Sequence, residues 1–290
     1  MRRRGAVGLV LLGAGLVVLG AIAWGVARGG RPGGDSVAVV AVEGIIADSR
    51  QVVEQIERYR LQRSVKALVL RIDSPGGSVA PSQEIYGAIV KFRRASGKPV
   101  VASMGRVAAS GGYYIAAAAD RIVANPGSIT GSIGVIMQLP NVSGLLQKVG
   151  VRTTIMKSGE FKDLGGAVRD LTDAERKILQ DLLDDVHAQF IDAVAAGRKM
   201  DRALVVPLAD GRVFTGRHAL AVGLVDELGD LRDAITRAAT LAGLPESPGV
   251  IQEHRRWWLW DLVAGLADGT DRALSWPMPS ASVDYLWTVR

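Results

Sequence analysis

The sequence predicts an α/β protein built around a mostly parallel sheet. Short β-branched apolar runs alternate with amphipathic stretches between residues 36 and 125. The apolar runs have the length and composition of buried strands, and the amphipathic stretches have the residue spacing of helices. Strands that alternate with helices are joined by right-handed crossovers, which place successive strands parallel to one another in one sheet.

The individual elements follow in chain order. We expect strands over residues 36–46, 66–73, 98–105 and 121–125, and helices over 53–62, 81–96, 111–119 and 172–199. "DSPGGS" ends the second strand sharply, because Pro75 fixes φ and Gly76 permits a positive φ. Gly97 ends the second helix, and Thr172 with Glu175 forms a capping box at the start of the last one.

Composition excludes several classes of function. The 290 residues contain no cysteine, which excludes disulfides, thiolate metal sites and cysteine nucleophiles. The three histidines, His187, His218 and His254, show no metal-ligand spacing, and we expect neither a metal nor another cofactor. Five of the six net positive charges lie between residues 2 and 31, so the rest of the sequence has no charge excess that would indicate nucleic-acid binding.

An apolar segment near the N-terminus predicts a membrane anchor. Residues 5–27 are uncharged and almost wholly apolar, and they are long enough as a helix to cross a hydrocarbon core. A cleaved signal peptide has a shorter apolar core of ~7–15 residues, so we expect an uncleaved transmembrane helix. The basic stub at residues 1–4 should stay in the cytoplasm, which places the Gly/Pro-rich linker at 28–36 and the following domain outside.

Two glycine-rich turns each follow a predicted strand. "SPGG" at 74–77 and "ASGG" at 109–112 occupy equivalent places after neighbouring strands. Each turn taken alone is ordinary turn chemistry. Ser110, however, enters a helix between small residues, and the N–H of Gly77 and the N–H groups after Ser110 can stabilise an anion. The two turns together therefore predict a nucleophile that faces an oxyanion hole.

A nucleophilic serine requires a general base, and two residue types are candidates. His187 lies in the middle of a predicted helix, where a histidine is ordinarily a surface residue. Lys162, in "MKSGEFKDLGG", follows a predicted strand in a glycine-rich loop, although most lysines in such places are solvated charges. A lysine base must be neutral, which burial beside a hydroxyl favours. Ser132 is the candidate for that hydroxyl, and Lys157 is the alternative lysine.

Five ordered motifs lie between residues 73 and 229: "DSPGGS", "AASGGYYIAAAAD", "SITGSIGVIM", "KSGEFKD" and "DGRVFTGRHALAVGLVDELG". In this order and spacing they resemble the bacterial signal peptide peptidase A family in its short, single-domain form. The resemblance implies a Clp protease/crotonase-like spiral of ββα units, after one N-terminal transmembrane helix. It implies a dyad in which Ser110 is the nucleophile and Lys162 the general base, with Ser132 orienting the lysine. The implied oxyanion donors are the backbone N–H groups of Gly77 and Gly111.

The same resemblance implies a function. We expect a membrane-anchored serine endopeptidase that degrades remnant signal peptides and other extended apolar peptides through an acyl-enzyme. We also expect a homo-oligomeric ring in the bacterial inner membrane, with a single pass and the catalytic domain on the extracytoplasmic side. Three alternatives remain: a related membrane serine protease with one specific membrane-protein partner, an acyl-CoA enzyme on the same scaffold, and an inactive scaffold.

The C-terminal tail differs in composition from the serine protease domain, which we expect at residues 37–245. Five of the six tryptophans lie in the tail, residues 246–290. We favour packing of this tail on its own or a neighbouring subunit. The alternatives are an interfacial amphipathic helix over 255–276, and an extended segment, "SVDYLWTVR", in the active-site groove.

Overall fold

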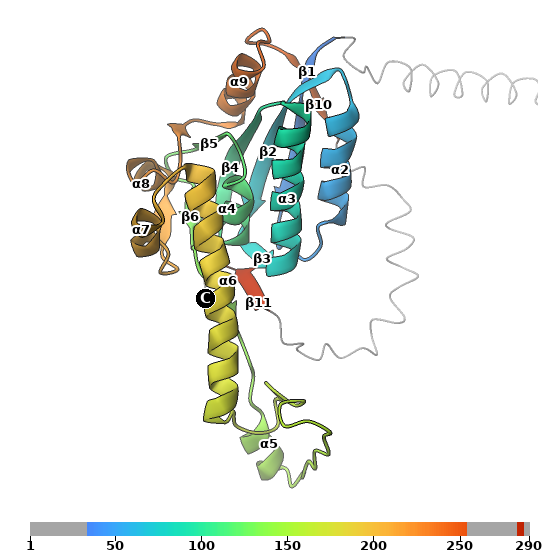
Figure 1. Cartoon of the computed structure of the whole chain (residues 1–290), viewed down its shortest axis with the longest axis vertical. Helices are drawn as coiled ribbons and strands as arrows, with labels where there is room; N and C mark the ends of the chain where they lie inside the picture. Colours follow the sequence, from blue (N-terminus) through green and yellow to red (C-terminus); the bar gives the residue numbers. More distant parts are fainter. Residues whose placement is uncertain (1–33, 254–282, 287–290) are drawn as a thin grey trace, which may run out of the picture.

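The computed structural model describes residues 34–253 and 283–286. No helix within these ranges is both long and apolar enough to span a membrane. The predicted anchor at 5–27 and most of the tail lie outside the described residues. Figure 1 shows a layered α/β body from which one long helix, α6 (Asp173–Arg198), projects.

The main sheet is mostly parallel, as the alternation of strands and helices predicts. Its central order is β10-β1-β2-β4-β5-β9, and β6 and β8 extend it beside β4. Neighbours along the central order are parallel, whereas β6 and β8 are antiparallel to each other. The bounds are β1 (Ser36–Glu43), β2 (Val65–Ser74), β4 (Val100–Ala109), β5 (Arg121–Ala124), β6 (Ile129–Gly131), β8 (Val213–Thr215), β9 (Glu227–Leu228) and β10 (Gly249–Gln252).

Helices cover both faces of this sheet, so its strands are apolar on both sides. Val40 and Leu70 belong to a core shared with α2, α3 and α4, whereas Val39 and Val69 pack with alanines of α9 on the other face. This alternation follows from the two-residue period of a strand. The helix bounds are α2 (Arg50–Leu61), α3 (Val79–Ser96), α4 (Gly111–Ala116), α7 (Arg202–Val205), α8 (Gly216–Ala221) and α9 (Leu231–Leu241), with a short 3₁₀ turn at Val206–Leu208.

A second, smaller sheet lies at the C-terminal edge of the main sheet. Its strands are β3 (Gly76–Ser78), β11 (Val283–Leu286) and β7 (Ile136–Met137), with β11 in the middle. β11 is antiparallel to both neighbours and lies against α3 and α4 (Figure 1). A segment from the end of the chain therefore occupies the space between two strands that belong to the body.

The helix α6 packs on the body through its C-terminal half. Phe190 and Val194 are buried in the core, and a Cβ added at Gly197 would lie 1.9 Å from the carbonyl oxygen of Ala117. The N-terminal half extends away from the body, and α5 (Ser143–Lys148) and its neighbouring loops lie at the far end (Figure 1). We call residues 138–172 the arm.

The turns and caps expected from the sequence are confirmed, but one strand is not. Gly97 ends α3 in the left-handed conformation, and Thr172 forms the predicted capping box with Glu175. The strand expected before Lys162 is wrong, because residues 151–157 are irregular and exposed. Their β-branched composition suits a strand, but no described strand pairs with them, and an unpaired strand is unstable in water.

The ion pair between Arg198 and Asp226 tests how α6 is fastened to the body. The Arg198 Nη1 atom lies 2.8 Å from an Asp226 carboxylate oxygen, and the two side chains are 6% and 20% exposed. We expect Arg198→Met to lower the free energy of unfolding by about 3 kcal/mol, because it leaves a largely buried carboxylate unpaired. Arg202→Met breaks an exposed pair with Asp192 and should cost less than about 1 kcal/mol. Urea denaturation measures both, and equal costs would contradict the expectation.

Candidate active site

Ser110 occupies the turn between β4 and α4. Its φ of 54° and ψ of −118° are rare for a residue other than glycine. Its N–H donates to the carbonyl oxygen of Gly131 at 2.8 Å, and a Cβ added at Gly112 would lie 3.0 Å from the carbonyl oxygen of Ser74. The residue is 1% exposed, and its hydroxyl makes no hydrogen bond to another described residue. A strained strand-to-helix turn of this kind is the geometry that presents a serine as a nucleophile.

The backbone of Gly77 faces the small sheet. The N–H of Ser78 donates to the carbonyl of Ile46 at 2.8 Å, and the N–H of Ile46 donates to the carbonyl of Gly76 at 2.9 Å. In a parallel bridge of this type, the N–H and C=O of the middle residue, Gly77, point to the opposite side. On that side lies β11, with Tyr285 opposite Gly77. The N–H of Gly77 is therefore directed at whatever strand lies between β3 and β7.

Glycine is required at position 77 by the closeness of the chain beside it. A Cβ added there would lie 2.3 Å from the carbonyl oxygen of Ile46. Gly111 supplies a second donor, because it is the first residue of α4 and its N–H has no partner within the helix. The helix α4 lies against β3, so both donors belong to the same edge of the molecule as Ser110.

Ser132 lies beside the same turn. The strand β6 pairs with β4 up to Gly131, which is opposite Ala109, and Ser132 follows directly. It has a φ of 51°, is 8% exposed, and its N–H donates to the carbonyl of Arg212 at 2.8 Å. The structure thus brings together four of the five residues that the sequence predicts for the site, namely Ser110, Ser132, Gly77 and Gly111.

Lys162 lies elsewhere within one chain. It is exposed in the arm, and its ammonium has no hydrogen bond to another described residue. Figure 1 shows the arm at the far end of α6 from the sheet. The alternative, Lys157, donates to Asp163 at 2.6 Å and to the carbonyl of Glu160 at 2.7 Å, so its ammonium is engaged within the arm. The Nε2 of His187 is buried and has no hydrogen-bond partner among the described residues, so it is not bonded to Ser110.

The arm is fastened to α6 by Arg169. Its guanidinium donates to Asp163 at 2.7 Å and to Glu175 at 2.8 Å. The side chain of Glu175 is 2% exposed and also accepts from the N–H of Thr172 at 2.9 Å. The Arg169 guanidinium lowers the pKa of Glu175 to about 2, and it holds the pKa of Asp163 well below its usual range. Charge and capping thus fix the base of the arm.

Sequence reasoning missed Ser74, which shapes the turn before Gly77. Ser74 is fully buried, and its hydroxyl donates to the carbonyl of Gly44 at 2.6 Å. The same oxygen accepts from the N–H of Gly76 at 3.1 Å. A serine two residues before a turn glycine is the available signal, because such hydroxyls bond to the backbone two residues on.

The position of β11 bears on the tail. Residues 283–286 lie extended opposite Gly77 of the same chain. This is the arrangement expected if the segment "SVDYLWTVR" occupies the active-site groove. The segment 255–276, for which the sequence suggests an interfacial helix, lies outside the described residues.

Comparison with known proteins gives family matches and relatives over most of the chain. The sequence model of Peptidase family S49 matches residues 92–245, and that of Clp protease matches residues 38–128, which is consistent with the mixed α/β fold. A protease-named protein of Synechocystis sp., slr0021, is 49% identical over 210 residues, 72% of this chain and 75% of the relative.

Two further relatives are longer than the region they share with this chain. A protein of Enterococcus faecium named as signal peptide peptidase SppA is 36% identical over 209 residues, 68% of this chain and 60% of its own length. Protease 4 of Salmonella typhi is 39% identical over 222 residues, 73% of this chain and 36% of its own length. This chain therefore spans less than two thirds of either.

The Arg169 network predicts that acid releases the arm. The pKa of Glu175 is lowered from 4.5 to about 2, so its stabilising contribution is complete above pH 4.5 and is lost as the pH falls toward 2. A spin label at Met156→Cys, a position 94% exposed in a chain without cysteine, should gain mobility across that window. With Arg169→Gln the label should be mobile at neutral pH. Unchanged mobility down to pH 2, with circular dichroism intact, would contradict this expectation.

Proposed function

This chain belongs to peptidase family S49 and is a serine protease, and we propose that it cleaves extended apolar peptides, including remnant signal peptides, with Ser110 as its nucleophile. The observation that carries the proposal is the strained, buried turn of Ser110. Backbone donors at Gly77 and Gly111 lie at the same edge, which is the arrangement that acyl transfer requires.

The proposed reaction proceeds through an acyl-enzyme. The Ser110 oxygen attacks the peptide carbonyl carbon while its proton passes to a neutral lysine. The N–H groups of Gly77 and Gly111 stabilise the tetrahedral oxyanion, a contribution of ~3–4 kcal/mol per donor in other hydrolases. The lysine then gives its proton to the leaving amine, and water, deprotonated by the same lysine, hydrolyses the ester.

The substrate is proposed to bind as an added strand between β3 and β7. The backbone of β11 lies in this place, antiparallel to both strands, which supports the fit of an extended peptide. Main-chain hydrogen bonds hold an extended segment whatever its side chains, so the groove selects peptides that can be drawn out of a fold or a membrane. The tail would then compete with substrate for the same backbone groups.

We propose that Lys162 serves the active site of a neighbouring copy in a homo-oligomer. Ser110 is buried at the sheet edge, whereas Lys162 is exposed in the arm. The arm also exposes apolar side chains, with Met156 94%, Val149 63% and Leu145 61% exposed. Packing these residues against a second copy would bury apolar surface and remove water from around the lysine, which favours the neutral amine. A closed ring would give every copy one such neighbour.

The membrane anchor remains part of the proposal. Residues 5–27 would hold the domain at the bacterial inner membrane, with the basic stub in the cytoplasm and the catalytic domain on the extracytoplasmic side. An anchored protease meets signal peptide remnants where they are released.

A mixing experiment tests both the dyad and its division between copies. We expect Ser110→Ala and Lys162→Ala each to abolish hydrolysis of an apolar fluorogenic peptide, whereas Lys148→Ala, in the same arm, keeps it. Co-expression of the two inactive variants should restore about one quarter of the activity, because random neighbours combine an intact serine with an intact lysine at that frequency. An inactive mixed assembly of unchanged mass would place the base within one copy. Full activity of Lys162→Ala would exclude this lysine as the base.

A second prediction concerns the tail. A chain that ends at residue 282 should have a KM lower by on the order of tenfold with an unchanged kcat, because a tethered strand competes at a high effective concentration. Tyr285→Pro, which removes an N–H opposite Gly77, should act in the same direction, and Thr288→Pro outside β11 should not. Steady-state kinetics on an apolar fluorogenic peptide measures this. An unchanged KM would show that β11 does not compete with substrate.

A further inference from the structure

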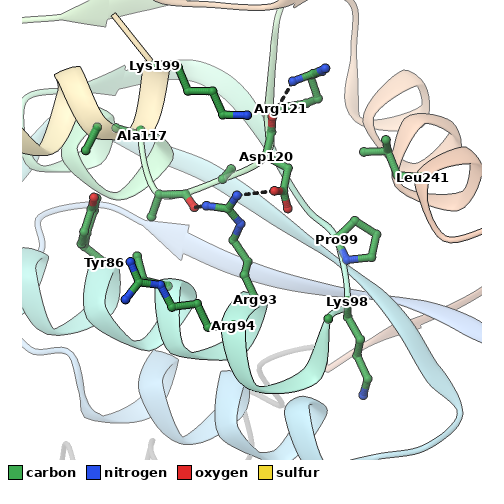
Figure 2. Close-up of a pocket in the computed structure, with 16 residues that line it drawn as sticks. Tyr86, Arg93, Arg94, Lys98, Pro99, Ala117, Asp120, Arg121, Lys199 and Leu241 are labelled. Atoms are coloured by element: carbon green, nitrogen blue, oxygen red, sulfur yellow. Dashed lines mark hydrogen bonds and ion pairs between the residues drawn. The ribbon is translucent and has the colours of Figure 1, made fainter.

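A large cleft lies at the edge of the sheet opposite the active site. It has a volume of about 720 Å³ and is bounded by the C-terminal ends of α3 and α6, the segment before β5, and the last residue of α9 (Figure 2). Its lining contains five cationic side chains and one carboxylate: Arg93, Arg94, Lys98, Arg121, Lys199 and Asp120. We call it the basic cleft. The lining carries a large excess of positive charge, whereas residues 32–290 together have a net charge of only +1.

Three of the cations have structural partners. Arg93 pairs with Asp120 and also donates to the carbonyl of Ala118 at 2.7 Å. Lys98 donates to three backbone carbonyls near the end of α2, and Arg121 donates to the carbonyl of Asp120 at 2.9 Å. These contacts explain the three cations, because they neutralise the single carboxylate or bond to carbonyl groups, several of them at helix ends, where positive charge is ordinarily found.

The contacts within the domain do not explain the positive charges of Arg94 and Lys199. Neither side chain makes a hydrogen bond or ion pair with another described residue, and the two side chains extend from different walls of the cleft, α3 and the end of α6 (Figure 2). Lys199 has a φ of 52°, the left-handed conformation that ordinarily favours glycine at a helix end. The chain therefore keeps a cation where glycine would be less strained, and the Nε of Arg93 nearby is buried with no hydrogen-bond partner in the described part of the chain.

The cleft lies on the edge where the chain enters the domain. β1, β4 and β5 are parallel, so Ser36, Val100 and Arg121, their first residues, share one edge. Eight residues, 28–35, separate the apolar segment 5–27 from Ser36, and eight extended residues reach at most about 29 Å. Neighbouring strands are about 4.8 Å apart, so the cleft lies roughly 10–15 Å along the edge from Ser36. A membrane that holds the segment is within reach of the cleft.

We call the edge at which the parallel strands β1, β4 and β5 begin the strand-start edge. We propose that the basic cleft binds the phosphate group of an anionic membrane lipid and holds this edge of the domain against the bilayer. This inference rests on the proposed anchor, because the anchor brings the cleft to the membrane. Binding of the lipid in the cleft depends on the positive charges of Arg94 and Lys199. Two cationic side chains that line one cleft without an ion-pair partner among the described residues attract an anionic headgroup, and basic residues at an anionic surface each strengthen attachment about fivefold. The active-site edge would then point away from the headgroups.

Energy transfer between the domain and labelled headgroups tests this proposal. The full chain is reconstituted in vesicles of phosphatidylcholine alone or mixed with phosphatidylglycerol. A donor dye is placed at Ser247→Cys, just before β10 on the strand-start edge, or at Ile45→Cys, just beyond the other end of β1. We expect phosphatidylglycerol to raise energy transfer from position 247 and not from position 45.

Charge variants decide whether the cleft is responsible. Arg94→Gln with Lys199→Gln should lower the ratio of docked to undocked domain about 25-fold, whereas Lys148→Gln with Arg152→Gln, an exposed pair in the arm, should leave it unchanged. Equal energy transfer in both lipids, or no effect of the cleft variants, would overturn the proposal. Energy transfer that rises with the amount of protein per vesicle, and not with phosphatidylglycerol, would indicate that the cleft binds a second copy of the chain. That outcome would also overturn the proposal.

Flotation of the same vesicles separates this proposal from the anchor. If the chain floats with neutral vesicles but its energy transfer does not depend on phosphatidylglycerol, the anchor is supported and the lipid site is refuted. A chain that floats with anionic vesicles only, and loses flotation when Arg94 and Lys199 are replaced, keeps the lipid site and refutes the anchor. A chain that floats with neither refutes both.

Discussion

The turn at Ser110 is held by backbone contacts on both sides. Its N–H donates to the carbonyl of Gly131 at the end of β6. The helix that it begins packs against the end of β2, where a Cβ added at Gly112 would lie 3.0 Å from the carbonyl oxygen of Ser74. A non-glycine residue in such a conformation costs about 1–3 kcal/mol and persists only where its surroundings force it. Here the parallel pairing of β2, β4 and β6 supplies that force, so the sheet directly maintains the proposed nucleophile.

The same pairing explains why the groove lies where it does. Because Ile46 uses the backbone groups on either side of Gly77, the N–H and C=O of Gly77 are left facing a neighbouring strand. β7 faces the same space from the other side, and β11 lies between them. A site built from backbone groups suits a protease for extended chains, since such groups bind peptides without regard to sequence.

The body and the arm divide the proposed chemistry between them. The body carries the serine and the oxyanion donors, and the arm carries Lys162 on a segment that α6 supports at a distance. Arg169 and the capping box at Thr172 fasten the base of the arm to α6. The exposed apolar side chains of the arm belong to neither hydrophobic core cluster of the described residues, which is the physical reason to expect a second copy against them.

Local patterns in the sequence determined most of the body. Two-residue and helical periodicity, Gly97, the capping box and the two glycine-rich turns depend on neighbouring residues, and each of these was predicted correctly. The proximity of Ser110, Gly77 and Gly111 followed from their places at the ends of neighbouring parallel strands, whereas Ser132 was proposed only as a candidate hydroxyl and from the family resemblance. Only the tertiary structure placed Lys162 away from them, since a lysine in a loop carries no record of which surface it will meet. The β-branched run at 151–155 and the strand at 283–286 show the same limit: whether a strand forms depends on a partner distant in the sequence, and local spacing does not encode that partner.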